Sequence, residues 1–282
     1  MAVLQVDFVS QCLMRTVTVK VILPVDKIAK MDGEMPYTPE KFKTLYLLHG
    51  MLGNHTDWID GTRISRWAQE KNLAVVMPAG ENRFYVDNPR EGAYFGAYIG
   101  RELVEITRKM FPLSDRREDT FIAGLSMGGC GAICNGLKYH ETFSHIAALS
   151  SGLLLEDILA SDNNAALPFM RRSYYESVLG DLSRLRGSDL DYEALILDLK
   201  AKGAAVPRMY LCCGTEDFLI DKNRKYGEFL KAEGIDVVYE EGPGAHEWDF
   251  WDTYIRKILD WLPLDEGSKG LNSGNVGVES CR

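Results

Sequence analysis

The chain has 282 residues, of which 46% are hydrophobic and 26% are charged. These proportions are those of a folded globular protein and exclude a disordered, collagen-like or coiled-coil chain. The length suits one large α/β domain. With 32 Lys and Arg against 41 Asp and Glu the net charge is −9, so nucleic acid and anionic membrane surfaces are not expected as partners.

The sequence carries no signal for a membrane span or for export. No apolar run approaches the roughly 18 to 20 residues that cross a bilayer. The N-terminal segment alternates like a strand and has no basic start, apolar stretch and small-residue cleavage site. Six cysteines are few for this length, and most lie in apolar segments. We therefore expect a cytoplasmic protein with reduced thiols.

Eight apolar segments rich in β-branched residues are predicted to be strands. The first two alternate polar with apolar residues, as an antiparallel edge hairpin would, whereas the later ones are almost continuously apolar, as doubly buried strands must be. Their spacing leaves room for helices, which predicts a mostly parallel sheet with helices on both faces. The predicted strands are 4–10, 15–23, 44–49, 74–78, 120–125, 146–149, 208–213 and 237–241.

Helices are predicted at 64–71, 97–110, 127–139, 192–202, 222–233 and 248–261. In the last of these, the apolar residues step by three and four positions and so share one helix face. Residues 151–207 lack a strong strand signal and mix helical pieces with Asn, Asp and Gly, which predicts a helical insertion after the sixth strand. We expect residues 1–264 to form one domain and the glycine-rich residues 265–282 to form a flexible tail.

The segment GLSMGG at 124–129 lies between a predicted buried strand and a predicted helix. A G-x-S-x-G sequence in this context is typical of a nucleophile elbow, a tight turn that exposes a serine hydroxyl. Gly124 and Gly128 are expected because side chains two residues before and after the serine would collide. No phosphate-loop lysine or dinucleotide-type acidic residue follows, so the pattern favours Ser126 as a nucleophile over a phosphate-binding turn.

A serine hydroxyl becomes a good nucleophile when a histidine takes its proton and a carboxylate orients that histidine. Asp217 follows the strand at 208–213, and His246 lies in a Gly/Pro loop after the strand at 237–241. The chain order Ser, Asp, His is the one expected after a nucleophile elbow. We predict that His246 is the base and Asp217 its partner, with Glu216 as the alternative acid. Structural roles are expected for the remaining histidines, His49, His55, His140 and His145.

The oxyanion that forms during attack on an ester needs two fixed hydrogen-bond donors. One is predicted to be the backbone N–H of Met127, which directly follows the nucleophile. The second is expected from the loop after the third strand, where Gly50 lets the chain bend. Met51 is the preferred donor and Leu52 the alternative, and the sequence leaves this choice open.

Together these segments resemble the α/β-hydrolase serine esterases of the esterase D and tributyrin-esterase group, which is related to S-formylglutathione hydrolases and shares its fold with mycolyltransferases. The resemblance covers about residues 1–262 and rests on LYLLHGMLGNHTDW, YFGAYIGRELVEITRKMFP, TFIAGLSMGGCGA, LSSGLL, CGTEDFL and HEWDFW. It implies a triad of Ser126, Asp217 and His246, with Met51 and Met127 as oxyanion amides. It also implies hydrolysis of short-chain acyl esters through an acyl-enzyme, without a metal or organic cofactor.

The substrate is less constrained than the chemistry. The insertion is too short for a large lipase lid, which favours small soluble esters, acetyl to butyryl, over lipids. The alternatives are an acetyl or feruloyl esterase acting on plant oligosaccharides, an S-formylglutathione thioesterase, and a non-catalytic binding protein on the same fold; a homo-oligomer is left open. The residues expected to line a substrate pocket are Trp58, Tyr85, Tyr94, Leu153, Leu154, Phe169, Met170, Tyr174 and Tyr175.

Overall fold

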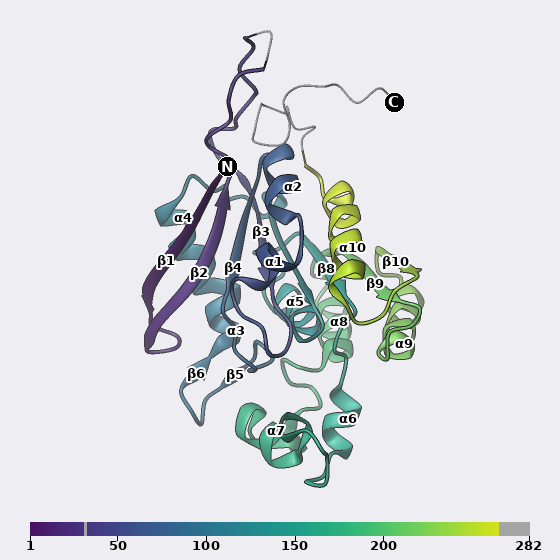
Figure 1. Cartoon of the computed structure of the whole chain (residues 1–282). Coiled ribbons are helices and arrows are strands. Elements are labelled where there is room, and N and C mark those ends of the chain that lie inside the picture. The colour runs from purple at the N-terminus through teal and green to yellow at the C-terminus, as the bar shows by residue number, and fades with distance from the viewer. Residues whose placement is uncertain (31–32, 265–282) are drawn as a thin grey trace.

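The computed structural model describes residues 1–30 and 33–264, so the predicted tail at 265–282 lies outside the described residues. Its centre is an eight-stranded sheet in the order β1-β2-β4-β3-β7-β8-β9-β10 (Figure 1). β1 and β2 form an antiparallel hairpin at one edge, and β2 pairs antiparallel with β4. The other strands of this sheet, β3, β7, β8, β9 and β10, run parallel to β4. The strands are β1 (Ala2–Ser10), β2 (Arg15–Leu23), β3 (Lys43–Leu48), β4 (Leu73–Pro78), β7 (Thr120–Leu125), β8 (His145–Leu149), β9 (Arg208–Gly214) and β10 (Val237–Gly242).

All eight predicted strands are therefore confirmed, and this sheet with helices on both faces is an α/β-hydrolase fold. The sequence did not predict the small hairpin of β5 (Asp87–Asn88) and β6 (Ala93–Tyr94), nor the short helix α1 (Asp57–Gly61). These elements are too short to show a clear hydrophobic period. The remaining helices are α2 (Ile64–Glu70), α3 (Phe95–Ala97), α4 (Leu103–Met110), α5 (Met127–Lys138), α6 (Leu155–Ala160), α7 (Arg172–Leu179), α8 (Tyr192–Ala201), α9 (Ile220–Ala232) and α10 (Trp248–Trp261).

The predicted helix at 97–110 is interrupted by a π-helical turn at Tyr98–Glu102, between α3 and α4. Glu102, in this turn, accepts hydrogen bonds from the Ser10 hydroxyl and the Gln11 N–H, both at 2.5 Å. The turn thereby ties the helix to the β1–β2 connection.

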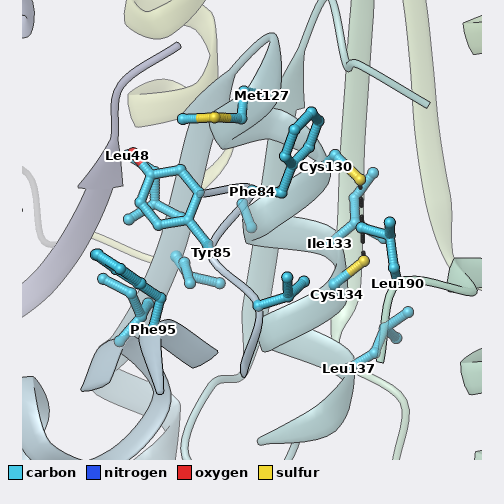
Figure 2. Packing of buried hydrophobic residues seen from close by; sticks show 14 of the residues in the cluster. Leu48, Phe84, Tyr85, Phe95, Met127, Cys130, Ile133, Cys134, Leu137 and Leu190 are labelled. Atoms are coloured by element: carbon cyan, nitrogen blue, oxygen red, sulfur yellow. Dashed lines mark hydrogen bonds between the residues drawn. The ribbon is translucent and has the colours of Figure 1, made fainter. Parts of the chain in front are cut away.

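Two hydrophobic cores, one on each face of the sheet, hold the helices in place. α2 and α10 pack on one face, and α10 buries Trp251, Ile255 and Ile258 there, as its period predicts. α4, α5, α8 and α9 pack on the other face. Figure 2 shows the buried face of α5 in this second core, where Cys130 and Cys134 pack beside Ile133 and Leu137. Both thiols are free and buried, so they are core residues.

The insertion after β8 contains α6, α7 and α8, with short 3-10 turns between them. α6 and α7 lie together beyond one end of the sheet (Figure 1). The Tyr174 hydroxyl of α7 donates to the Asn82 carbonyl at 2.8 Å, and the ring of Tyr175 packs against Phe84. The insertion is thus fixed to the loop that follows β4. Among the described residues, no helix is long and apolar enough to span a membrane.

His145, at the start of β8, is buried between two aromatic rings. Its ring centroid lies 5.3 Å from that of Phe121 and 5.1 Å from that of Trp261, and the residue is 7% exposed. Burial, with smaller contributions from Arg208 and Arg117, lowers the pKa of His145 from 6.5 to about 4. The neutral imidazole is therefore the form that the folded protein accommodates.

This pKa predicts acid sensitivity in a defined window. Between pH 6.5 and about 4 the unfolded chain binds a proton at His145 that the folded chain does not bind. The contribution of His145 to the free energy of unfolding should therefore fall by about 3 kcal/mol as the pH is lowered through this window. Urea denaturation from pH 7 to 4 measures this loss. His145→Gln should lose correspondingly less stability over the same range, and equal losses in both proteins would contradict the prediction.

Candidate active site

Ser126 occupies the tight turn between β7 and α5. Its φ of 53° lies in the left-handed region, which is rare for residues other than glycine. A Cβ on Gly124 would collide with the Gly128 carbonyl, and a Cβ on Gly128 would collide with the His49 carbonyl at the end of β3. The expected reason for both glycines is confirmed. The turn holds the Ser126 hydroxyl clear of both elements.

Ser126, His246 and Asp217 form one hydrogen-bonded series. The Ser126 Oγ lies 3.0 Å from His246 Nε2, and His246 Nδ1 lies 2.9 Å from Asp217 Oδ2. The Asp217 side chain is fully buried, and its Oδ1 also accepts the Leu219 N–H at 2.9 Å. Burial alone would raise the pKa of Asp217, but hydrogen bonds from His246, Leu219 and Ser150 hold it below its usual value. The carboxylate is thus kept ionised beside the imidazole.

Glu216, the alternative acid, has a different role in the structure. Its carboxylate accepts the Gly244 N–H at 2.6 Å and the Thr215 hydroxyl at 2.8 Å. Its own N–H donates to the Gly244 carbonyl at 3.1 Å. Glu216 therefore binds the backbone of the loop that carries His246, while Asp217 binds the imidazole itself.

The loop after β3 lies against the elbow. A Cβ built on Gly50 would be 3.3 Å from the Cβ of Ser126. The Leu52 N–H donates to Asn82 Oδ1 at 2.8 Å, so this amide is already engaged. The Met51 and Met127 amides have no acceptor among residues 1–30 and 33–264. The hydrogen bond to Asn82 thus favours Met51 over Leu52 as the second donor, which the sequence left open.

Two aromatic side chains predicted as pocket walls instead anchor the end of β3. Trp58 Nε1 donates to the Leu48 carbonyl and the Tyr85 hydroxyl donates to the His49 carbonyl, both at 2.9 Å. Trp58 is 1% exposed and Tyr85 is completely buried, one in each core, so neither can line an open pocket. The pocket prediction is wrong for both residues. Their polar groups bind carbonyls at the end of the strand, and this allows the rings to be buried in the cores. His49 accepts the Gly80 N–H at 2.8 Å, a structural role as expected.

The other predicted pocket residues lie in three places. Leu153 and Leu154 follow Gly152, whose N–H donates to the Ser126 carbonyl at 2.8 Å, so the chain brings them to the elbow. Leu153 is buried and Leu154 is partly buried. In the insertion, Phe169 and Tyr174 are partly exposed. Of the remaining three, Tyr175 is buried, Met170 is exposed in the insertion, and Tyr94 is exposed on β6.

Two further residues adjoin the series and were not singled out from the sequence. Ser150, directly after β8, is completely buried and has a φ of 45°. Its hydroxyl accepts Trp251 Nε1 at 3.1 Å and also interacts with the Asp217 carboxylate. The Trp251 ring meets His246 edge-on at a centroid distance of 4.9 Å. The adjacent serines of LSSGLL were a visible signal, but the sequence does not show which hydroxyl turns toward the acid.

Comparisons with known proteins agree with this geometry. Residues 10–262 match the model of the Esterase family. The chain is 46% identical over 262 residues to an acetyl esterase of Caldicellulosiruptor saccharolyticus, covering 93% of this chain and 98% of the relative. Two solved structures from Staphylococcus aureus each cover 93% of this chain and are 98% covered themselves. The fluorophosphonate-binding serine hydrolase FphF is 28% identical with a TM-score of 0.80, and the S-formylglutathione hydrolase FrmB is 30% identical with a TM-score of 0.78.

The match spans nearly the whole of the described chain, and the relatives are serine hydrolases that share its α/β-hydrolase sheet. The chain belongs to the Esterase family and is a carboxylic ester hydrolase of the serine hydrolase type.

Proposed function

We propose that the chain hydrolyses esters of small acyl groups, acetyl esters first, with Ser126 as nucleophile, His246 as base and Asp217 as the residue that orients the base. The observation that carries this proposal is the continuous hydrogen-bonded series from Ser126 Oγ through His246 to the buried Asp217 carboxylate. A neutral serine hydroxyl reacts slowly, and this arrangement supplies both the base and the charge that stabilises the base when it is protonated.

The proposed reaction has two halves. As Ser126 Oγ attacks the ester carbonyl carbon, His246 Nε2 takes the hydroxyl proton and then gives it to the oxygen of the leaving alcohol. The acyl group remains on Ser126. A water molecule, deprotonated by the same imidazole, then attacks the acyl-enzyme, and the imidazole returns the proton to Ser126 Oγ as the acid leaves. Asp217 stays ionised throughout, which its lowered pKa favours.

The negative charge on the carbonyl oxygen is proposed to be stabilised by the N–H groups of Met51 and Met127. Met127 is the first residue of α5, so the partial positive charge of the helix N-terminus adds to its hydrogen bond. Gly50 supports the placement of Met51, because it brings the loop backbone against Ser126.

The relatives support the choice of acyl group. The 46% identical relative is an acetyl esterase, which favours acetyl esters. FrmB, an S-formylglutathione hydrolase, supports a second candidate, the hydrolysis of a short acyl thioester by the same residues. The feruloyl alternative and a homo-oligomer stay predictions. A reducing compartment such as the cytoplasm fits the free cysteines Cys12, Cys130, Cys134, Cys212 and Cys213.

The first test compares wild type with Ser126→Ala on p-nitrophenyl acetate, butyrate and octanoate and on S-formylglutathione. We expect kcat/KM on the acetate to fall by roughly ten-thousandfold or more, because the nucleophile is lost. Wild-type rates should decrease from acetate to octanoate. A higher kcat/KM on S-formylglutathione than on acetyl esters would assign the thioesterase function instead.

Labelling with a fluorophosphonate distinguishes a non-catalytic protein of this fold from an active enzyme with a narrow substrate range. Folded wild type should be labelled at Ser126, and Ser126→Ala should not be labelled while its melting temperature stays near that of wild type. Folded wild type that is neither labelled nor active on any of these substrates would contradict the proposed function.

Ser150→Ala tests whether the Ser150 hydroxyl positions Asp217. Removing it deprives the carboxylate of one of its hydrogen bonds, and we expect kcat to fall about tenfold with little change in KM. The matched control is Ser151→Ala. Ser151 is equally buried, but its hydroxyl has no hydrogen-bond partner among the described residues. Equal kcat values for the two variants would contradict a positioning role for Ser150.

A further inference from the structure

Phe218 is exposed at the candidate active site although its chain neighbours are buried. Its exposure is 75%, against 2% for both Asp217 and Leu219. The Asp217 N–H donates to the Gly214 carbonyl at 3.1 Å, and the Leu219 N–H donates to Asp217 Oδ1 at 2.9 Å. The backbone is thus fixed on both sides of Phe218, and the ring is held outward by the same turn that places Asp217.

The exposed ring packs on His246. The two ring centroids are 4.8 Å apart with an interplanar angle of 51°. Trp251 meets the same imidazole edge-on, at 4.9 Å and 88°. His246 is therefore held between a buried indole and an exposed phenyl ring, while its Nε2 reaches Ser126 Oγ at 3.0 Å.

The direction of proton transfer decides which part of an ester lies near this ring. The leaving alcohol oxygen must take its proton from His246 Nε2, so that oxygen has to lie within hydrogen-bond reach of the imidazole. The carbonyl oxygen must instead face the Met51 and Met127 amides. The alcohol part of the substrate consequently lies on the side of His246, the residue on which the exposed Phe218 ring packs.

We propose that Phe218 is a specificity-determining residue that binds the leaving alcohol and favours alcohols carrying a ring with an apolar face. An aromatic side chain packs well against such a ring, and the contact excludes water from both surfaces. Aryl alcohols and the C–H face of a pyranose share this chemistry. The inference rests on the proposed function, because it takes His246 as the group that protonates the leaving oxygen.

The test uses three acetate esters that differ only in the alcohol: methyl acetate, phenyl acetate and methyl 6-O-acetyl-glucopyranoside. For each, kcat/KM of Phe218→Ala is divided by that of wild type, so differences in intrinsic reactivity cancel. We expect about a five- to tenfold loss on one or both ring-bearing esters, relative to methyl acetate. Loss on phenyl acetate alone assigns aryl alcohols, loss on the glucoside alone assigns sugars, and loss on both assigns any ring with an apolar face.

Two control variants sharpen the comparison. Phe218→Tyr keeps the ring and should retain the wild-type preference. Val9→Ala removes an apolar side chain that is 68% exposed on β1, at the opposite edge of the sheet, and should leave all three ratios unchanged. The deacylation rate of Phe218→Ala should be the same with all three esters, because they share the acetyl-enzyme after the alcohol has left.

Other outcomes would overturn the inference. An equal loss on all three esters would make Phe218 a residue that only positions His246, and no loss on any would leave it without a role in specificity. Failure of the proposed function gives a different result, because wild type would then show no Ser126-dependent turnover of any of the three esters.

Discussion

The close approach of the elbow to the end of β3 is the constraint on which the active-site geometry depends. A Cβ at Gly124 would collide with the Gly128 carbonyl, and a Cβ at Gly128 would collide with the carbonyls at the end of β3. Because β3 and β7 are neighbours in the sheet, the same contact places the loop at Gly50 against Ser126. The nucleophile and the proposed oxyanion amides are therefore positioned by one packing contact. Trp58 and Tyr85 reinforce it by binding the last carbonyls of β3 from the two cores.

The acid and base are supported from the opposite side of the elbow. β9 and β10 deliver Asp217 and His246, and α10 adds Trp251, whose indole binds Ser150 and packs on the imidazole. The buried carboxylate would be unfavourable in its charged form without hydrogen bonds, and two of its three partners, Ser150 and His246, come from other segments of the chain. Charge placement at this site is thus a product of tertiary packing, although each residue sits where its strand ends.

The sequence predicts the parts of this molecule that local pattern determines. The buried strands, the period of α10 and the elbow glycines each follow from residues close together in the chain. The preference for Met51 over Leu52 depends on the hydrogen bond that the Leu52 N–H donates to Asn82, thirty residues away. Trp58 has the aromatic character of a pocket residue, but its indole N–H binds the Leu48 carbonyl and its ring lies in the core. The φ of Ser150 has no signature in the residue type. Contacts between different segments account for the first two of these differences.

The hydrogen bonds of Glu216 affect how the loops that carry Asp217 and His246 move. Among the described residues, β10 is an edge strand that pairs with β9 alone, and such elements open more readily than the buried core. Glu216 nevertheless joins the two loops, since it donates to and accepts from Gly244, and Thr215 donates to the Gly242 carbonyl. The two loops are therefore coupled into one mechanical unit. Fluctuations at this edge then displace the acid and the base together and preserve the distance between them.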